Sequence, residues 1–144
     1  MYDPSVNRDF YAVWAKGAAL YVQWASKHGI GYPELIVLYS LTTMGNLTQK
    51  EIREDFGLLK QTVNTVIASL KKRELIVLEP CKEDKREKLV VLTQRGHRYA
   101  RELIEPLLEA EDRIYKKIGY DRLDVAQETM ELFNLLFARE LEGE

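Results

Sequence analysis

Four short polar side chains lie close together at Gln61, Thr62, Asn64 and Thr65, and Lys60 precedes them directly. The amides of Gln and Asn offer a donor beside an acceptor and can pair with the edge of adenine, and the methyl group of Thr can contact thymine. A neighbouring cation would meet phosphate, where charge matters and base sequence does not. These residue types therefore predict recognition of base edges, with an ordinary solvated helix face as the alternative.

A helix from about residue 60 to 73 would position these side chains. Its apolar residues recur at helical spacing and would face the core, namely Val63, Val66, Ile67 and Leu70. The opposite face would present the polar set, which continues with Ser69 and Lys72. We expect Lys60 and Lys72 to contact phosphates, and the Gln, Asn and Thr side chains to contact bases.

A shorter helix is predicted to begin at Thr48. Glu51 lies three residues later, a spacing typical of a capping box, and Gly57 is suited to end the helix in the left-handed conformation. Two short helices joined by a tight turn indicate a helix-turn-helix. We expect Thr48 and Gln49, at the start of the first helix, to join the nucleic-acid contact.

Two β-prone runs follow at residues 76–78 and 89–92, and Pro80 argues against a helix between them. The sequence therefore predicts a two-stranded hairpin with a cationic tip. Its charged residues include Lys82, Asp84, Lys85, Arg86 and Lys88. Such a tip beside a helix-turn-helix can reach phosphates or the minor groove, with Asp84 orienting Arg86 by a charge-assisted hydrogen bond. A solvated charged turn is the alternative.

The first long helix, from residue 6 to about 28, has two apolar faces. One is a heptad-like seam of Tyr11, Trp14, Ala18, Tyr21, Ala25 and His28, and the other carries Phe10, Val13, Leu20 and Trp24. One subunit can bury one face, so we expect a partner subunit to bury the other. A fully buried helix in a monomer is the alternative.

Further helices complete the chain. Pro33 fits the first turn of the second helix, Thr93 can cap a long helix that Pro106 should kink, and Asp121 is expected to cap the last helix after Gly119. The predicted fold is mostly α with a small two-stranded β-wing. Within a single domain of residues 1–144, a winged helix-turn-helix at residues 32–93 would be inserted into a helical dimerisation body of residues 1–30 and 94–144.

Charge is unevenly distributed along the chain, whose net charge is −2. Residues 46–98 hold 12 Lys or Arg against 8 Asp or Glu, a net of +4, and residues 99–144 hold 6 against 12, a net of −6. The first 45 residues are neutral, with 3 of each sign. Positive charge is thus concentrated on the predicted DNA-binding region, and the acidic C-terminal part should face away from a polyanion.

Several other classes are disfavoured. No stretch approaches the roughly twenty apolar residues of a membrane span, and the start lacks the apolar region of a secretory signal. The single cysteine, Cys81, fits a reducing cytoplasm, and a redox role beside Lys82 is an alternative to an incidental small residue. Without a phosphate-binding Gly-rich loop, a G-x-S-x-G elbow or a Cys/His cluster, we expect neither catalysis nor a cofactor or metal.

Five motifs in order resemble the multiple-antibiotic-resistance regulator (MarR) family. They are T-Q-x-E at residues 48–51, K-Q-T-V-N at 60–64, L-K-K-x-x-L-I at 70–76, D-K-R at 84–86 and L-T-x-x-G at 92–96. The resemblance implies a homodimeric transcriptional regulator, a repressor that binds a pseudo-palindromic operator in double-stranded DNA. It also implies release of DNA by a small, often aromatic, effector. A winged-helix protein-interaction module without DNA binding is the alternative function.

The chain departs from the family pattern at three positions. Leu59 replaces the usual Ser, so the recognition helix would lack its cap; Glu74 replaces Gly; and Thr65 stands where a basic residue is common.

The resemblance also favours an effector pocket, which four aromatic residues would line: Trp14, Tyr21, Tyr39 and Phe56. Aromatic residues at helical spacing are more often part of a plain core, which is the alternative.

Overall fold

The computed structural model describes residues 3–143 and divides into two compact units, one ending at Glu105 and the other beginning at Pro106. The first unit contains helices α1 (Pro4–Lys27), α2 (Tyr32–Met44), α3 (Gln49–Phe56) and α4 (Lys60–Lys72), and strands β1 (Leu47–Thr48), β2 (Ile76–Pro80) and β3 (Lys88–Leu92). Helix α5 (Gln94–Ile118) begins in this unit and continues into the second, which also holds α6 (Tyr120–Glu142). None of the helices described is both long enough and apolar enough to cross a membrane.

The strands form an antiparallel sheet in the order β1-β3-β2. In the hairpin, Ile76 pairs with Leu92 and Pro80 with Lys88, which confirms the predicted wing. A third strand was not predicted: Leu47 and Thr48 pair with Val90 and Leu89. A strand of two residues is too short to show the alternation by which strands are recognised in sequence.

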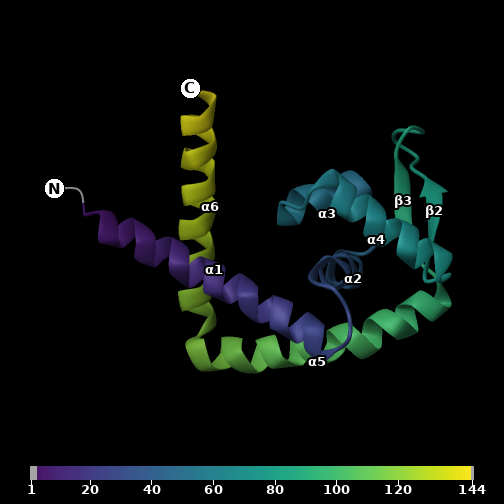
Figure 1. Ribbon diagram of the computed structural model, residues 1–144, viewed down its shortest axis with the longest axis horizontal. Coiled ribbons are helices and arrows are strands. Elements are labelled where there is room, and N and C mark those ends of the chain that lie inside the picture. Colours follow the sequence, from purple (N-terminus) through teal and green to yellow (C-terminus); the bar gives the residue numbers. More distant parts are fainter. Residues whose placement is uncertain (1–2, 144) are drawn as a thin grey trace. The chain divides into compact units, whose positions relative to one another are not determined.

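The core of the first unit forms around α2, which packs against α1, α3 and α4 (Figure 1). Helix α2 is apolar nearly all round, and such a helix is stable when neighbours cover most of its surface. Its buried residues are Leu35, Ile36, Val37, Leu38, Ser40 and Leu41. Helices α3 and α4 each contribute apolar residues from one face, namely Ile52 of α3 and Val63, Ile67 and Leu70 of α4, whereas α1 buries only Ala25.

Helix α5 begins where the sequence predicted, at a Thr93 cap whose Oγ1 accepts a hydrogen bond from the backbone N–H of Gly96 at 2.9 Å. The same hydroxyl donates to the backbone oxygen of Glu74 at 2.8 Å and so ties α5 to the turn after α4. Gly96 is required here, because a Cβ atom would lie 1.8 Å from the backbone oxygen of Leu75.

In the second unit, α5 continues through Pro106 and is followed by Gly119, which has a φ of +99°. The prediction that Asp121 caps α6 was wrong, because the N-cap residue is Gly119 and Asp121 lies in the first turn. A hydrogen-bonded cluster stabilises this corner instead: Asp112 accepts from Lys116 at 2.6 Å and from the hydroxyl of Tyr120 at 3.0 Å. The hydrogen bond from Lys116 is the main reason why the pKa of Asp112 is lowered.

Candidate nucleic-acid interface

The polar face of α4 is accessible. Gln61, Asn64, Thr65 and Ser69 are exposed, and Thr62 is half-buried. The opposite face is anchored in the core by Val63, Ile67 and Leu70, each at most 3% exposed. The helix therefore has one fixed face and one face available to a partner.

The hydroxyl of Thr65 donates a hydrogen bond to the backbone oxygen of Gln61 at 2.9 Å. Its proton is thus used within the helix, as is common for Thr in helical positions. The group that Thr65 offers to a partner is therefore mainly its methyl, which suits contact with thymine rather than with a hydrogen-bonding base edge.

The start of α4 has no side-chain cap. This was expected, because position 59 is Leu instead of the Ser that is usual in the family. Leu59 is 75% exposed and offers no oxygen to the first backbone N–H groups of the helix. Unpaired N–H groups at a helix start attract anions through both hydrogen bonding and the helix dipole. This end of α4 is therefore electrostatically suited to a phosphate.

The start of α3 has the predicted capping box. Thr48 Oγ1 accepts from the backbone N–H of Glu51 at 3.1 Å, and the Glu51 carboxylate accepts from the backbone N–H of Thr48 at 2.8 Å. Thr48 is buried, so its side chain fixes the start of α3, whereas Gln49 is half-buried and lies at the edge of the exposed face.

The tip of the wing is a tight turn organised by Asp84. Its Oδ1 accepts from the backbone N–H of Arg86 at 2.9 Å, and its backbone oxygen accepts from the backbone N–H of Glu87 at 3.1 Å. We expected Asp84 to hold the guanidinium of Arg86, but the hydrogen bond goes to the backbone. The side chains of Lys85, Arg86 and Lys88 are exposed at this tip.

A hollow of about 280 Å³ brings three segments together. Its lining residues are Gln49, Lys50 and Arg53 of α3, Lys60 and Asn64 of α4, and Arg86, Glu87 and Lys88 of the wing. Five of these eight are cations and one is an acid, so we call it the cationic groove. The sequence predictions missed Lys50 and Arg53, although their spacing of three residues on a short helix places them on one face.

Lys72, which we expected to contact phosphate, lies at the other end of α4. Thirteen helical residues place it roughly 18 Å along the axis from Lys60. It lines a separate hollow with residues of the α4–β2 turn and of α5.

That end of α4 is held by a polar cluster that no sequence pattern predicted. Arg73 forms an ion pair with Glu34 of α2, and the hydroxyl of Tyr99 in α5 donates to Glu34 at 3.1 Å. The guanidinium of Arg73 also lies over the Tyr99 ring, 5.0 Å from its centroid. Three helices are thereby connected through one carboxylate.

Burial and charge shift the pKa values in this cluster. Burial is the largest cause of the raised pKa of Tyr99, and the negative charge of Glu34 raises it further. For Arg73, burial lowers the pKa, but the hydrogen bonds and charges of Glu34 and Tyr99 outweigh burial and leave it raised. Both groups therefore keep their protons at neutral pH, which is the state in which each can donate to Glu34.

The four aromatic residues of the expected effector pocket divide into two sets. Tyr39 and Phe56 meet edge to face with ring centroids 6.3 Å apart. Trp14 is 56% exposed and contacts Tyr11 instead, with centroids 5.9 Å apart, and Tyr21 is half-buried. The pocket itself stays a prediction.

Helices α3 and α4, joined by a tight turn and followed by a two-stranded hairpin, form a winged helix-turn-helix, with an exposed polar face on α4 and a cationic groove beside it. The model of the MarR family matches residues 28–87. The uncharacterized HTH-type transcriptional regulator YwoH of Bacillus subtilis is 35% identical over 101 residues, which cover 70% of this chain and 68% of YwoH. The chain therefore belongs to the MarR family.

Solved structures agree with this assignment. The MarR family regulator NMB1585 of Neisseria meningitidis is 30% identical, with a TM-score of 0.72 over 86% of this chain and 92% of that one. NadR, solved in complex with 4-hydroxyphenylacetate, is 17% identical and shares the fold, with a TM-score of 0.72 over 87% of this chain and 89% of NadR.

Proposed function

We propose that this protein is a sequence-specific DNA-binding transcriptional regulator, a repressor that binds a pseudo-palindromic operator as a homodimer. One observation carries the proposal: residues of α3, α4 and the wing converge on the cationic groove, directly beside the exposed polar face of α4. Membership of the MarR family supports the same reading.

Helix α4, helix α3 and the wing each make a different kind of contact with DNA. The N-terminal half of α4 enters the major groove, where Gln61 and Asn64 pair with bases and Thr65 offers its methyl to thymine. Lys60, with Lys50 and Arg53 of α3, meets the phosphates that flank this site. Arg86 at the tip of the wing reaches the neighbouring minor groove.

Exposed apolar residues support a dimer. Helix α1 leaves Tyr11, Val13 and Leu20 more than 60% exposed, and α6 has no buried residue in the described chain. Apolar surface of this extent is typical of an interface. A two-fold dimer would present two copies of α4 to two half-sites of an operator.

A small aromatic effector forms the last part of the proposal. NadR, which shares the fold, was solved with 4-hydroxyphenylacetate. In this chain, Tyr39 and Phe56 offer a pair of aromatic rings, and Trp14 and Tyr21 of α1 offer two more. Aromatic rings of this kind suit a flat apolar ligand.

Selection of bound sequences from random DNA duplexes tests the function. The proposal predicts enrichment of a pseudo-palindrome, with an affinity that falls steeply with salt as counterions are released. Lys60→Gln should lower the magnitude of the salt slope by roughly one for each subunit engaged, whereas Arg101→Gln, on the exposed face of α5, should leave it unchanged. If no sequence is enriched, the alternative function, a winged-helix protein-interaction module without DNA binding, is favoured.

A further inference from the structure

The two ends of α4 are held in different ways. At the C-terminal end, the backbone N–H of Leu75 donates to the backbone oxygen of Leu70 at 2.9 Å, a bond that closes the last turn of the helix. The hydroxyl of Thr93, which precedes α5, donates to the backbone oxygen of Glu74 at 2.8 Å and ties this turn to α5. The N-terminal end has no side-chain cap. Apart from its buried apolar face, α4 is therefore held at the end opposite the residues proposed to contact bases.

The carboxylate of Glu34 adds two further bonds at this C-terminal end. Its side chain is only 14% exposed and lies in the first turn of α2, where the helix dipole favours a negative charge. One carboxylate oxygen accepts from the guanidinium of Arg73, and the other accepts from the hydroxyl of Tyr99 at 3.1 Å. Glu34 therefore fixes the end of α4 and the first part of α5 to the same point of α2.

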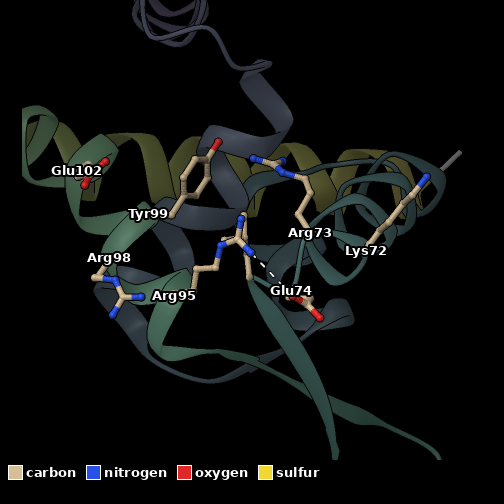
Figure 2. Close-up of a pocket in the computed structure, with 8 residues that line it drawn as sticks. Lys72, Arg73, Glu74, Arg95, Arg98, Tyr99 and Glu102 are labelled. Atoms are coloured by element: carbon tan, nitrogen blue, oxygen red, sulfur yellow. Dashed lines mark ion pairs between the residues drawn. The ribbon is translucent and has the colours of Figure 1, made fainter.

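The side chain of Arg73 is held from two sides. Besides its ion pair with Glu34, its guanidinium lies over the ring of Tyr99, 5.0 Å from the centroid. Figure 2 shows the charged end of Arg73 close to Tyr99, whereas the neighbouring Lys72 points away from both. A planar guanidinium that is bonded to a carboxylate and also contacts an aromatic ring is restricted in orientation. Since Arg73 is the C-cap residue of α4, these contacts restrict the direction of the helix.

The length of α4 amplifies any movement at this end. Its thirteen residues span roughly 18 Å, so a tilt of about 5° at the C-terminal end moves the N-terminal end by roughly 1.5 Å. Hydrogen bonds to base edges are lost over such a distance, because they require close contact and good alignment. The attraction between a cation and a phosphate changes less, because it falls off slowly with distance. A loosened α4 would therefore lose base discrimination before it loses affinity for DNA in general.

From this geometry we infer that Glu34 is a positioning residue for base recognition: through Arg73 and Tyr99 it sets the direction in which α4 presents its exposed polar face. The inference rests on the proposed DNA-binding function and adds to it a residue of α2, outside the cationic groove. Glu34 contacts no base. It restricts the orientations of α4 before DNA is bound, so less conformational freedom is lost when the correct bases are contacted.

Glu34→Gln tests the inference, because it keeps the size of the side chain and removes its charge. The amide oxygen can accept from one of the two donors, but the amide NH₂ group then faces the other donor. Fluorescence anisotropy gives the affinities for a selected operator, for its single-base variants and for an unrelated duplex. The preference for the operator over its single-base variants should fall by roughly three- to tenfold, part of what an aligned bidentate contact provides. Affinity for the unrelated duplex should change by less than about twofold.

Glu105→Gln is the matched control. The carboxylate of Glu105 pairs with Arg101 at 3.3 Å on the exposed surface of α5, so the same chemical change removes an ion pair that does not involve α4. This variant should keep the base preference of the parent within about twofold, because an exposed pair of this kind contributes little. The inference is overturned if Glu105→Gln lowers the preference as much as Glu34→Gln.

The ratio of affinities separates positioning from a general loss of stability. A smaller folded fraction lowers the apparent affinity for every duplex by the same factor, so the ratio between duplexes stays constant. An unchanged ratio in Glu34→Gln would therefore overturn the inference, whatever the change in stability. If Glu34→Gln does not fold, Tyr99→Phe replaces it, because it removes the hydroxyl bound to Glu34 and keeps the ring beside Arg73. The ratio should then fall in the same direction by a smaller factor.

A measurement without DNA distinguishes this inference from the proposed function. In two-dimensional NMR of the ¹⁵N-labelled protein, Glu34→Gln should shift the backbone amide signals along α4 from Arg73 as far as Gln61, and Glu105→Gln should not. If no DNA sequence is selected but the shifts reach Gln61, the proposed function fails and the orientation of α4 by Glu34 holds. If the shifts are confined to the last turn of α4, the inference fails even for a protein that binds DNA.

Discussion

Glu74 links α4 to β2 in a left-handed conformation, with a φ of +58°. It is the single non-glycine residue with a positive φ among residues 3–143. This conformation costs an ordinary L-residue roughly 1–2 kcal/mol. The exposed ion pair of Glu74 with Arg95 returns little of that energy, because both charges are well solvated.

Glu74→Gly should therefore raise the free energy of unfolding by roughly 0.5–1 kcal/mol, because glycine adopts this conformation without steric cost but loses more entropy on folding. Urea denaturation measures the change. Glu79→Gly in β2 is the matched control and should lower the free energy of unfolding by a similar amount. A Glu74→Gly variant less stable than the parent would show that the Glu74 side chain stabilises the turn.

The sequence alone predicts the hydrogen bonds and backbone conformation of some residues but not of others. The capping box of Thr48 and Glu51 and the left-handed Gly57 were predicted correctly, because each follows from residues a few positions apart. The Glu34–Arg73–Tyr99 cluster was missed, because its members are separated by 39 and 65 residues and meet only when three helices pack. Local hydrogen bonds can be inferred from spacing, whereas distant ones require the fold.

At the scale of elements, α5 approaches the α4–β2 turn so closely that only glycine fits at position 96. Gly96→Ala should lower the free energy of unfolding by roughly 1–3 kcal/mol, because the added methyl must displace the backbone of Leu75. Thermal or urea unfolding followed by circular dichroism measures this loss.

Gly31→Ala is the control for that substitution. A Cβ at Gly31 would meet only the Cδ of Pro33, at an ordinary contact distance of 3.7 Å, so the expected change is a few tenths of a kcal/mol. Equal effects of the two substitutions would mean that the close approach of α5 to Leu75 does not constrain the fold.

Arg86 and Asp84 at the tip of the wing are expected to contribute to DNA binding. Arg86→Ala should weaken binding to a selected operator by roughly 1–3 kcal/mol if its guanidinium enters the minor groove. Asp84→Ala should cost less, because it loosens the turn through the backbone N–H of Arg86 and leaves the guanidinium present. Fluorescence anisotropy measures both, and circular dichroism confirms the fold. If both variants bind like the parent, the wing is a solvated hairpin.

Helices were predicted well because each has at least three turns of apolar spacing or a clear end signal. Strand β1 was missed because two residues carry no period, and it forms only where β3 offers an edge. The cap of α6 was misplaced by two residues, since an Asp beside a Gly suggested a cap that the backbone at Gly119 does not need. The sequence predicted the candidate interface on α4, the wing and the start of α3, but the positions of Lys50 and Arg53 of α3 in the groove required the packed structure.

For the whole molecule, the exposed apolar residues of α1 and α6 predict a dimer. Sedimentation equilibrium at micromolar concentration should give twice the 16.8 kDa mass of the chain. Leu20→Glu on α1 should shift the equilibrium toward the monomer, because it would place a charge in the interface. Val77→Glu, on an exposed position of β2, should not. A parent protein that sediments as a monomer would contradict the proposed two-fold dimer.

The central claim is that the exposed face of α4 reads bases, and base preference tests it most directly. Affinities of the parent, Gln61→Ala and Asn64→Ala are measured for a selected operator and for each of its single-base variants, at several salt concentrations. Each substitution should relax the preference at particular operator positions, by roughly 1–3 kcal/mol, and barely change the salt slope. The claim is contradicted if both variants retain every base preference of the parent.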